Sequence, residues 1–426
     1  MDNIIRPLGA AVLRSTNLFL DGGLLVAKDI ANFDLPALKD KIVNFDIRVL
    51  DAEAIIIMML LCIGIGILTL VIFAQLTSED NTPVVSKFNA ALGLNSGVVH
   101  KPGDPPIPPP TEIVSLRIYP IKSCRGMEVD ATRLRKTGLT LDRNWMFIDK
   151  AERKFLTIRS DPSMTLIDTA IVDKDKEQYL EISIHGTDGC VTIPAFPSQQ
   201  WLEANTTLQE AEIWEEMTDA WEYGADVNKI FCKFFDKEVA LVYKGPSPRN
   251  VAVNGKPELY GRKQNHHFAD VMSCLVASEA SLKDLNKQLE EDGHDPLTIE
   301  RFRPNIIVKG RDDHPWEEDT WKRIRITTAV PAAEAIYKLD LDCVARCARC
   351  QVPNVNPDTA EKHKTQPWDK LMKFRRVDQG GAAKYKPCFG MLSIPKNEGI
   401  IKVGSTLEVL ETTTKHLYNT ASFSEL

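Results

Sequence analysis

The chain has 426 residues, enough for two or three domains, and carries a formal net charge of -7 with a pI near 5.7. That charge argues against nucleic acid as the main partner, because phosphate contacts need a basic surface. Nine unevenly spaced cysteines do not form a disulfide framework, and residues 1–20 lack a secretory leader. Both features indicate a reducing compartment for the main body.

An uncharged, strongly apolar run extends from Ala54 to Ser78. As a helix, a run of this length spans a hydrocarbon core of about 30 Å, so we expect a single membrane span at 54–78 after an N-terminal segment at 1–53. A buried core helix is the alternative. Basic residues before the span favour a cytosolic N-terminus, whereas the cysteines favour a cytosolic C-terminal part. We give the cysteine argument more weight, because the number of basic residues close to the span differs by only two between its two sides.

A proline-rich stretch at 101–110 favours polyproline II, and we expect a semi-rigid linker at 79–110. Short β-branched runs then predict strands at 113–119, 145–149, 179–184, 239–243, 305–308, 323–326, 400–403 and 407–410. One clear helix is predicted from its N-cap Ser278 to Leu289. A polar stretch near residue 250 predicts a boundary between domains at 111–250 and 251–411, with a loose tail at 412–426.

Three cysteines, Cys343, Cys347 and Cys350, lie within eight residues of one another. Their spacing is that of the radical S-adenosylmethionine enzymes, but in that family most of a barrel follows the motif. A structural zinc ion would need a fourth ligand, such as Cys388 or His363. We interpret Cys343 and Cys347 as small buried side chains. That leaves Cys350 as a candidate metal ligand, with the neighbouring Arg349 expected to keep its thiol ionised.

Basic residues flank strands in three further segments. The segments are Tyr119-Pro-Ile-Lys122-Ser123-Cys124-Arg-Gly126, Leu141-Asp-Arg143-Asn-Trp145 and Phe302-Arg303-Pro304-Asn305. Each alone indicates a turn or a surface salt bridge, although arginine and lysine at strand ends also suit phosphate. Together with two further motifs, these segments resemble the MOSC family, named for the C-terminal domain of molybdenum cofactor sulfurase. The two motifs are Ser278-Glu-Ala-Ser-Leu282 and the pair Arg349-Cys350 followed by Asn356-Pro-Asp358-Thr359. The resemblance covers about residues 111–411, and within the family it points to the mitochondrial amidoxime-reducing components.

The resemblance implies an α+β, β-rich fold, with a MOSC N-terminal β-barrel module and a MOSC β-barrel domain behind the membrane helix. It implies a molybdenum cofactor, a molybdenum-bearing molybdopterin, whose metal is bound by Cys350. Asp270 matches a catalytic acid near the metal. The residues that match cofactor-binding positions are Lys122, Ser123, Arg143, Arg303 and Asn305. Val271 and Met272 replace the small hydroxyl residues usual after the acid, so Ser273 or backbone amides are expected to take over those contacts.

The function implied by the resemblance is reduction of N-hydroxylated substrates, such as amidoximes and hydroxylamines. Cytochrome b5 and NADH-cytochrome b5 reductase would supply electrons, since no Gly-x-Gly-x-x-Gly follows a strand. The outer mitochondrial membrane is the implied location, with the endoplasmic reticulum as the alternative. A second reading is a carrier of molybdenum cofactor or of persulfide sulfur on Cys350, as in cofactor sulfurases, where the MOSC domain acts beside a pyridoxal phosphate desulfurase. In this sequence no stretch the size of an aminotransferase domain, which such a desulfurase needs, precedes the MOSC region. The third interpretation is a membrane-tethered module that binds a ligand without turning it over.

Overall fold

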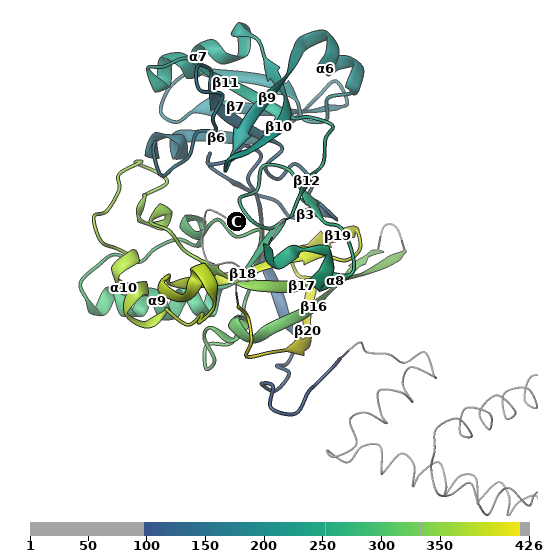
Figure 1. Cartoon of the computed structure of the whole chain (residues 1–426), viewed down its shortest axis with the longest axis vertical. Coiled ribbons are helices and arrows are strands. Elements are labelled where there is room, and N and C mark those ends of the chain that lie inside the picture. Colours follow the sequence, from purple (N-terminus) through teal and green to yellow (C-terminus); the bar gives the residue numbers. More distant parts are fainter. Residues whose placement is uncertain (1–97, 252, 332–333, 418–426) are drawn as a thin grey trace, which may run out of the picture. The chain divides into compact units, whose positions relative to one another are not determined.

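The computed structural model of the chain describes residues 98–251, 253–331 and 334–417 (Figure 1). The expected N-terminal segment at 1–53, the expected membrane span at 54–78 and most of the expected linker lie outside these ranges. Among the described residues, no helix is both long enough and apolar enough to cross a membrane.

Seven strands of the described chain close a barrel, in the order β1, β15, β14, β18, β17, β16 and β20. Their bounds are β1 Thr111–Ile118, β14 Cys274–Ser278, β15 Ile306–Val308, β16 Trp321–Val330, β17 Ala335–Ala348, β18 Cys388–Pro395 and β20 Thr406–Thr412. Neighbouring strands are antiparallel except β14 and β15, which are parallel. Strand β1 precedes the predicted boundary near residue 250, yet it closes this barrel by pairing with β15 and β20.

Strand β18 is buried along its whole length, because the barrel interior covers one face and two helices cover the other. These helices are α9, Glu279–Glu291, and α10, Trp368–Phe374, which lie side by side in Figure 1. The predicted helix is confirmed as α9, whose Leu285 and Leu289 are fully buried against Phe389 of β18. Ser278 occupies the N-cap position, although its side chain makes no capping hydrogen bond.

The N-terminal module contains two antiparallel sheets with strand orders β5-β11-β10-β9 and β6-β7-β8. The strands are β5 Trp145–Asp149, β6 Ile167–Lys174, β7 Glu177–Ile184, β8 Cys190–Pro194, β9 Thr206–Ile213, β10 Glu216–Tyr223 and β11 Val239–Lys244. Helices α6, Gln199–Asn205, and α7, Ala225–Phe235, complete the module (Figure 1). Helix α7 forms because its apolar residues recur at helical spacing, and its Phe231 packs on Phe147 of β5 with ring centroids 4.8 Å apart.

Shorter elements connect these parts. They are β2 Met127–Glu128, β3 Ala131–Arg135, β4 Gly138–Leu139, β12 Arg249–Asn250, β13 Asn265–His266, β19 Gly399–Lys402, α8 Pro257–Tyr260 and the 3-10 turns η2 Pro162–Leu166, η3 Val253–Gly255, η4 Ile299–Phe302, η5 Glu317–Thr320, η7 Val352–Asn354 and η8 Gly381–Tyr385. The eight predicted strands are confirmed as β1, β5, β7, β11, β15, β16, β19 and β20. The prediction of a β-rich fold with a barrel is therefore confirmed.

The described ends of the chain pack on the barrel. The N–H of Val99 donates to the carbonyl of Leu410 at 2.6 Å, and Lys101 pairs with Glu411 at 2.9 Å. In the expected tail, His416 is 3% exposed and its Nε2 lies 2.8 Å from the carbonyl of Trp321. These contacts depend on polar atoms that meet β16 and β20, so hydropathy did not predict them. Val99, Lys101 and His416 thus contact the barrel strands, in segments that the sequence assigned to a semi-rigid linker and a loose tail.

Candidate functional site

The pairing of β17 with β18 places the cysteine run at one end of the barrel. Ala348 pairs with Cys388, and the N–H of Arg349 donates to the carbonyl of Pro387 at 2.8 Å. Cys350 follows where the chain leaves the sheet, and it is half-buried. Cys343 is instead 1% exposed within the core, where burial raises the pKa of its thiol to about 12. In the described part of the chain, no three His, Cys, Asp or Glu side chains form a group that could hold a metal ion.

Arg349 does not pair with Cys350. Its Nη1 donates to the Sγ of Cys347 at 3.0 Å and its Nη2 to the carbonyl of Phe302 at 2.9 Å. The guanidinium of Arg349 is thus held by Cys347 and Phe302, and no contact with the thiol of Cys350 is present among the described residues.

The guanidinium beside Cys350 belongs to Arg159, which the sequence analysis missed. Burial acts to lower the pKa of Arg159, but Cys350 and Asp270, with a hydrogen bond to Cys350, outweigh it and raise that pKa. The guanidinium carbon lies 4.5 Å from the ring centroid of Trp214, whose Nε1 donates to Oδ1 of Asp270 at 3.1 Å. Arg159 follows a short apolar run, the same pattern of a basic residue at a strand end that singled out Lys122, so the signal was present.

Lys122 and Asp270, both predicted site residues, form a direct ion pair. Lys122 is buried, its Nζ also donates to the carbonyl of Phe268 at 3.1 Å, and burial lowers its pKa to about 8. Burial alone would raise the pKa of Asp270, but the charges of Lys122 and Arg159 hold it well below its ordinary value. The Asp270 side chain is 51% exposed, so water also favours its charged form. Asp270 is therefore an ionised carboxylate at neutral pH.

Arg143 and Arg303 form a second basic group on the fully buried ring of Tyr119. Their guanidinium carbons lie 4.6 and 4.2 Å from its centroid. Burial lowers the pKa of Arg303, and the charge of Arg143 lowers it further, which shows that the two cations are close. Asp142 neutralises Arg143 through a 2.6 Å contact, but Nη2 of Arg303 is buried without a hydrogen-bond partner among the described residues. A buried donor of this kind calls for an anion.

Ser123, Arg143 and Arg303 share an unusual backbone conformation. Their φ angles are 67°, 52° and 55°, in the left-handed region that residues other than glycine avoid at a cost of about 1–2 kcal/mol each. Strain of this kind persists mainly where surrounding structure holds it for a function. The Ser123 side chain lies on the turn after β1 and forms no hydrogen bond with a described residue. Three of the five predicted cofactor residues are thus held in strained turns.

Asn305 has a different role from the one expected. Its Oδ1 accepts hydrogen bonds from the N–H of Leu275 at 3.1 Å and from Arg143 at 3.2 Å. Its Nδ2 donates to the carbonyl of Arg117 at 3.2 Å and to Asp142 at 3.0 Å. These four bonds use the whole capacity of the amide. Asn305 therefore positions Arg143 and Asp142, and nothing in its side chain is left for a ligand.

The residues after Asp270 are apolar and packed inward. Val271 and Met272 join an apolar cluster with Leu275 and Val344. Ser273 is buried, and its Oγ has no hydrogen-bond partner in the part of the chain that the structure describes. A hydroxyl is thus present directly after the substituted pair, beneath the surface rather than on it.

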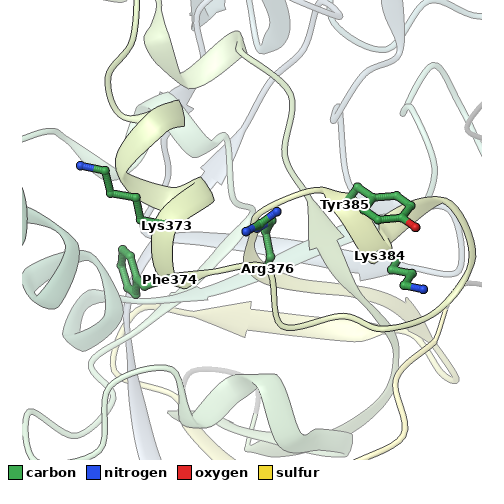
Figure 2. Close-up of a pocket in the computed structure, with 5 residues that line it drawn as sticks. All are labelled: Lys373, Phe374, Arg376, Lys384 and Tyr385. Atoms are coloured by element: carbon green, nitrogen blue, oxygen red, sulfur yellow. The ribbon is translucent and has the colours of Figure 1, made fainter.

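A separate pocket of about 320 Å³ lies between the end of α10 and η8. Figure 2 shows its lining residues, which are Lys373, Phe374, Arg376, Lys384 and Tyr385. The ammonium of Lys373 points away from Arg376 in this view, so the basic groups do not converge on one point (Figure 2). None of the predicted site residues lines this pocket.

Comparisons with known proteins bear directly on the family. The MOSC N-terminal beta barrel domain matches residues 111–238, and the MOSC domain matches residues 263–408. Together the two matches cover more than half of the 426 residues. The chain belongs to the MOSC-domain family. The resemblance drawn from five short motifs is therefore confirmed.

This MOSC protein has relatives with two kinds of name. It is 29% identical over 304 residues to the mitochondrial amidoxime-reducing component 1 of Homo sapiens, covering 70% of this chain and 82% of that one. It is 28% identical over 298 residues to the molybdenum cofactor sulfurase of Solanum lycopersicum, covering 66% of this chain and 33% of the sulfurase. A solved structure of the YUAD protein from Bacillus subtilis matches with a TM-score of 0.29 and 10% identity, over 70% of this chain and 95% of that one. Of these three similar proteins, the sulfurase carries the molybdenum cofactor in its name.

Proposed function

We propose that this MOSC protein is a molybdenum-cofactor oxidoreductase that reduces N-hydroxylated substrates, namely amidoximes and hydroxylamines. The observation that carries the proposal is the cluster of Arg159, Trp214 and Asp270, in which Arg159 also interacts with the half-buried thiol of Cys350 at the barrel end. The substrate class is supported by the names of the amidoxime-reducing relatives.

The side chains around Cys350 fit a molybdenum cofactor. The group carries an anionic phosphate and a metal that accepts soft sulfur ligands. The buried, unpartnered Nη2 of Arg303 is a donor that a phosphate oxygen would satisfy, and Arg143 lies beside it on the same ring. Cys347 and Cys350 are both partly exposed and each lies beside a guanidinium, that of Arg349 and of Arg159 respectively. Cys347 lies within β17 and packs on an apolar cluster, whereas Cys350 lies beyond the end of that strand.

The proposed roles follow from these positions. Cys350 would ligate the molybdenum, and Arg303, Arg143 and Ser123 would hold the pterin phosphate. When bound, the cofactor supplies the two-electron redox chemistry. The net reaction takes an amidoxime, two electrons and two protons to an amidine and water. Lys122, buried and ion-paired with the ionised Asp270, would add a positive charge to the cofactor site, and its pKa of about 8 lets it donate a proton to a bound substrate at neutral pH.

Electron supply and location form the outer part of the proposal. Cytochrome b5 and its NADH-dependent reductase are the proposed donors, by family resemblance. The apolar run at 54–78 is the proposed membrane anchor, with the two barrels in the cytosol. The outer mitochondrial membrane is proposed because similar proteins carry the word mitochondrial in their names, and the endoplasmic reticulum is the alternative.

Metal analysis followed by turnover tests the proposal. Protein purified from a host that makes molybdenum cofactor should contain about one molybdenum per chain and should reduce benzamidoxime to benzamidine with reduced methyl viologen. Bound molybdenum without turnover would contradict the reductase. A cyanide-labile sulfur without molybdenum would instead support the sulfur carrier, which the similarity to cofactor sulfurase favours. If the protein contains neither molybdenum nor labile sulfur and shows no turnover, the tethered binding module is the remaining interpretation.

A further inference from the structure

Arg159 is a cation at Cys350 that the cofactor-binding groups do not account for. The residue as a whole is exposed, although Trp214 and other neighbours partly shield its guanidinium from water, and it forms no salt bridge with any described residue. The guanidinium carbon lies 4.5 Å from the ring centroid of Trp214, a cation–π contact that holds the guanidinium against the indole. The N–H groups of a guanidinium lie along its edge, so stacking on the ring leaves them able to bind a ligand beside the thiol.

Trp214 reaches this place through a strained turn. Ile213 pairs with Glu216, so Trp214 and Glu215 are the two central residues of the hairpin between β9 and β10. Their φ angles are 51° and 64°, the geometry of a turn that normally takes Asn-Gly. A bulky residue there costs about 1–2 kcal/mol, and strain of this kind is typical of functional sites. The ring centroids of Phe155 and Trp214 lie 4.8 Å apart, so Phe155 packs on the indole and holds it in place.

Asp270 adds an acceptor to this donor. Its Oδ1 accepts hydrogen bonds from Lys122 and Trp214, whereas no described residue donates to its Oδ2. The guanidinium of Arg159, which interacts with the Cys350 thiol, and the carboxylate of Asp270 thus both contact the indole of Trp214. This pair is complementary to a ligand that carries an acceptor oxygen and an N–H on neighbouring atoms. An amidoxime has both, in its N–OH and its NH2.

We propose that Arg159 and Asp270 form the substrate-binding subsite, in which Arg159 donates to the oxygen of an N–OH group and Asp270 accepts from the adjacent N–H. Trp214 is a positioning residue that orients both. The subsite takes neutral N-hydroxylated compounds with a neighbouring N–H, and it discriminates against oximes that lack one. This inference rests on the proposed function, since it assigns the substrate of the same site.

Calorimetry on the oxidised, molybdenum-loaded full chain tests the subsite without turnover, because no electron donor is added. Losing one charge-assisted hydrogen bond should raise the Kd for benzamidoxime about tenfold to a hundredfold in Arg159→Leu, and Arg159→Lys should recover part of it. Trp214→Phe keeps the ring but removes the N–H bonded to Asp270, so its Kd should rise severalfold. Acetophenone oxime, in which a methyl replaces the amino group, should bind the wild type about tenfold more weakly. The molybdenum-to-protein ratio should be the same in every variant.

Three results would overturn the subsite. The first is an unchanged Kd in Arg159→Leu, and the second is no measurable binding to the wild type. The third is loss of molybdenum from Arg159→Leu, which would make Arg159 a cofactor ligand. Turnover of benzamidoxime by the wild type is measured separately with an artificial donor. Tight, Arg159-dependent binding without turnover would contradict the proposed reductase and support the subsite. Turnover by the wild type, with a Kd that does not change in Arg159→Leu, would support the reductase and contradict the subsite.

Discussion

Tyr119 gives the sharpest test of how the fold holds its basic groups, because one ring supports both Arg143 and Arg303. Each guanidinium–ring contact contributes about 0.5–2 kcal/mol, so Tyr119→Leu should remove about 1–4 kcal/mol of support. The hydroxyl donates to the carbonyl of Pro304 at 3.2 Å, which adds about 1 kcal/mol. Tyr119→Phe loses only that hydroxyl contact. Gly126 explains how the ring fits, since a Cβ at that position would overlap it.

The two Tyr119 variants form a matched pair for urea unfolding and molybdenum analysis. We expect the free energy of unfolding to fall by about 2–5 kcal/mol in Tyr119→Leu and by about 1 kcal/mol in Tyr119→Phe. The molybdenum-to-protein ratio should fall in the leucine variant and stay at the wild-type value in the phenylalanine variant. Equal molybdenum content in both variants would refute the idea that this ring positions the phosphate-binding arginines.

Three further predictions concern single side chains. Cys350→Ser should abolish benzamidoxime reduction, while Cys343→Ser, inside the core, should keep activity and lose only about 1 kcal/mol of stability; equal losses of activity would point to a shared cysteine site. Because burial lowers the pKa of Lys122 to about 8, molybdenum retained after gel filtration should decline as pH rises through that value, and Lys122→Arg should remove the decline. Burial, with the charge of Asp319, raises the pKa of Glu318 to about 7, so the stability linked to its protonated form is present below about pH 4.5 and lost as pH rises through 7. At pH 8, urea unfolding should therefore give Glu318→Gln a free energy of unfolding about 3 kcal/mol higher than that of the wild type. At pH 4 the variant should show no such gain.

Local strand formation followed from the sequence, but the closure of the barrel did not. The β-branched runs predicted eight strands correctly, because alternation and turn residues act over a few neighbours. The pairing of β1 with β15 and β20 joins residues about 190–300 positions apart, and no local pattern encodes it. The buried His416 was missed for the same reason, since its partner is the distant carbonyl of Trp321.

The candidate site was predicted in its chemistry more than in its geometry. Basic residues at strand ends indicated cationic groups at the site, and the structure pairs Lys122 directly with Asp270. Asn305 was assigned to the cofactor, yet its four hydrogen bonds are spent on protein groups, which only the fold reveals. Trp214 sits in a turn that favours Asn-Gly, so turn propensity predicted nothing there.

The central claim is that the sulfur of Cys350 is bonded to molybdenum. X-ray absorption at the molybdenum edge, on loaded wild type and on Cys350→Ser, measures the sulfur neighbours of the metal directly. The account predicts one fewer sulfur neighbour in the serine variant than in the wild type. The same number of sulfur neighbours in both proteins would contradict it.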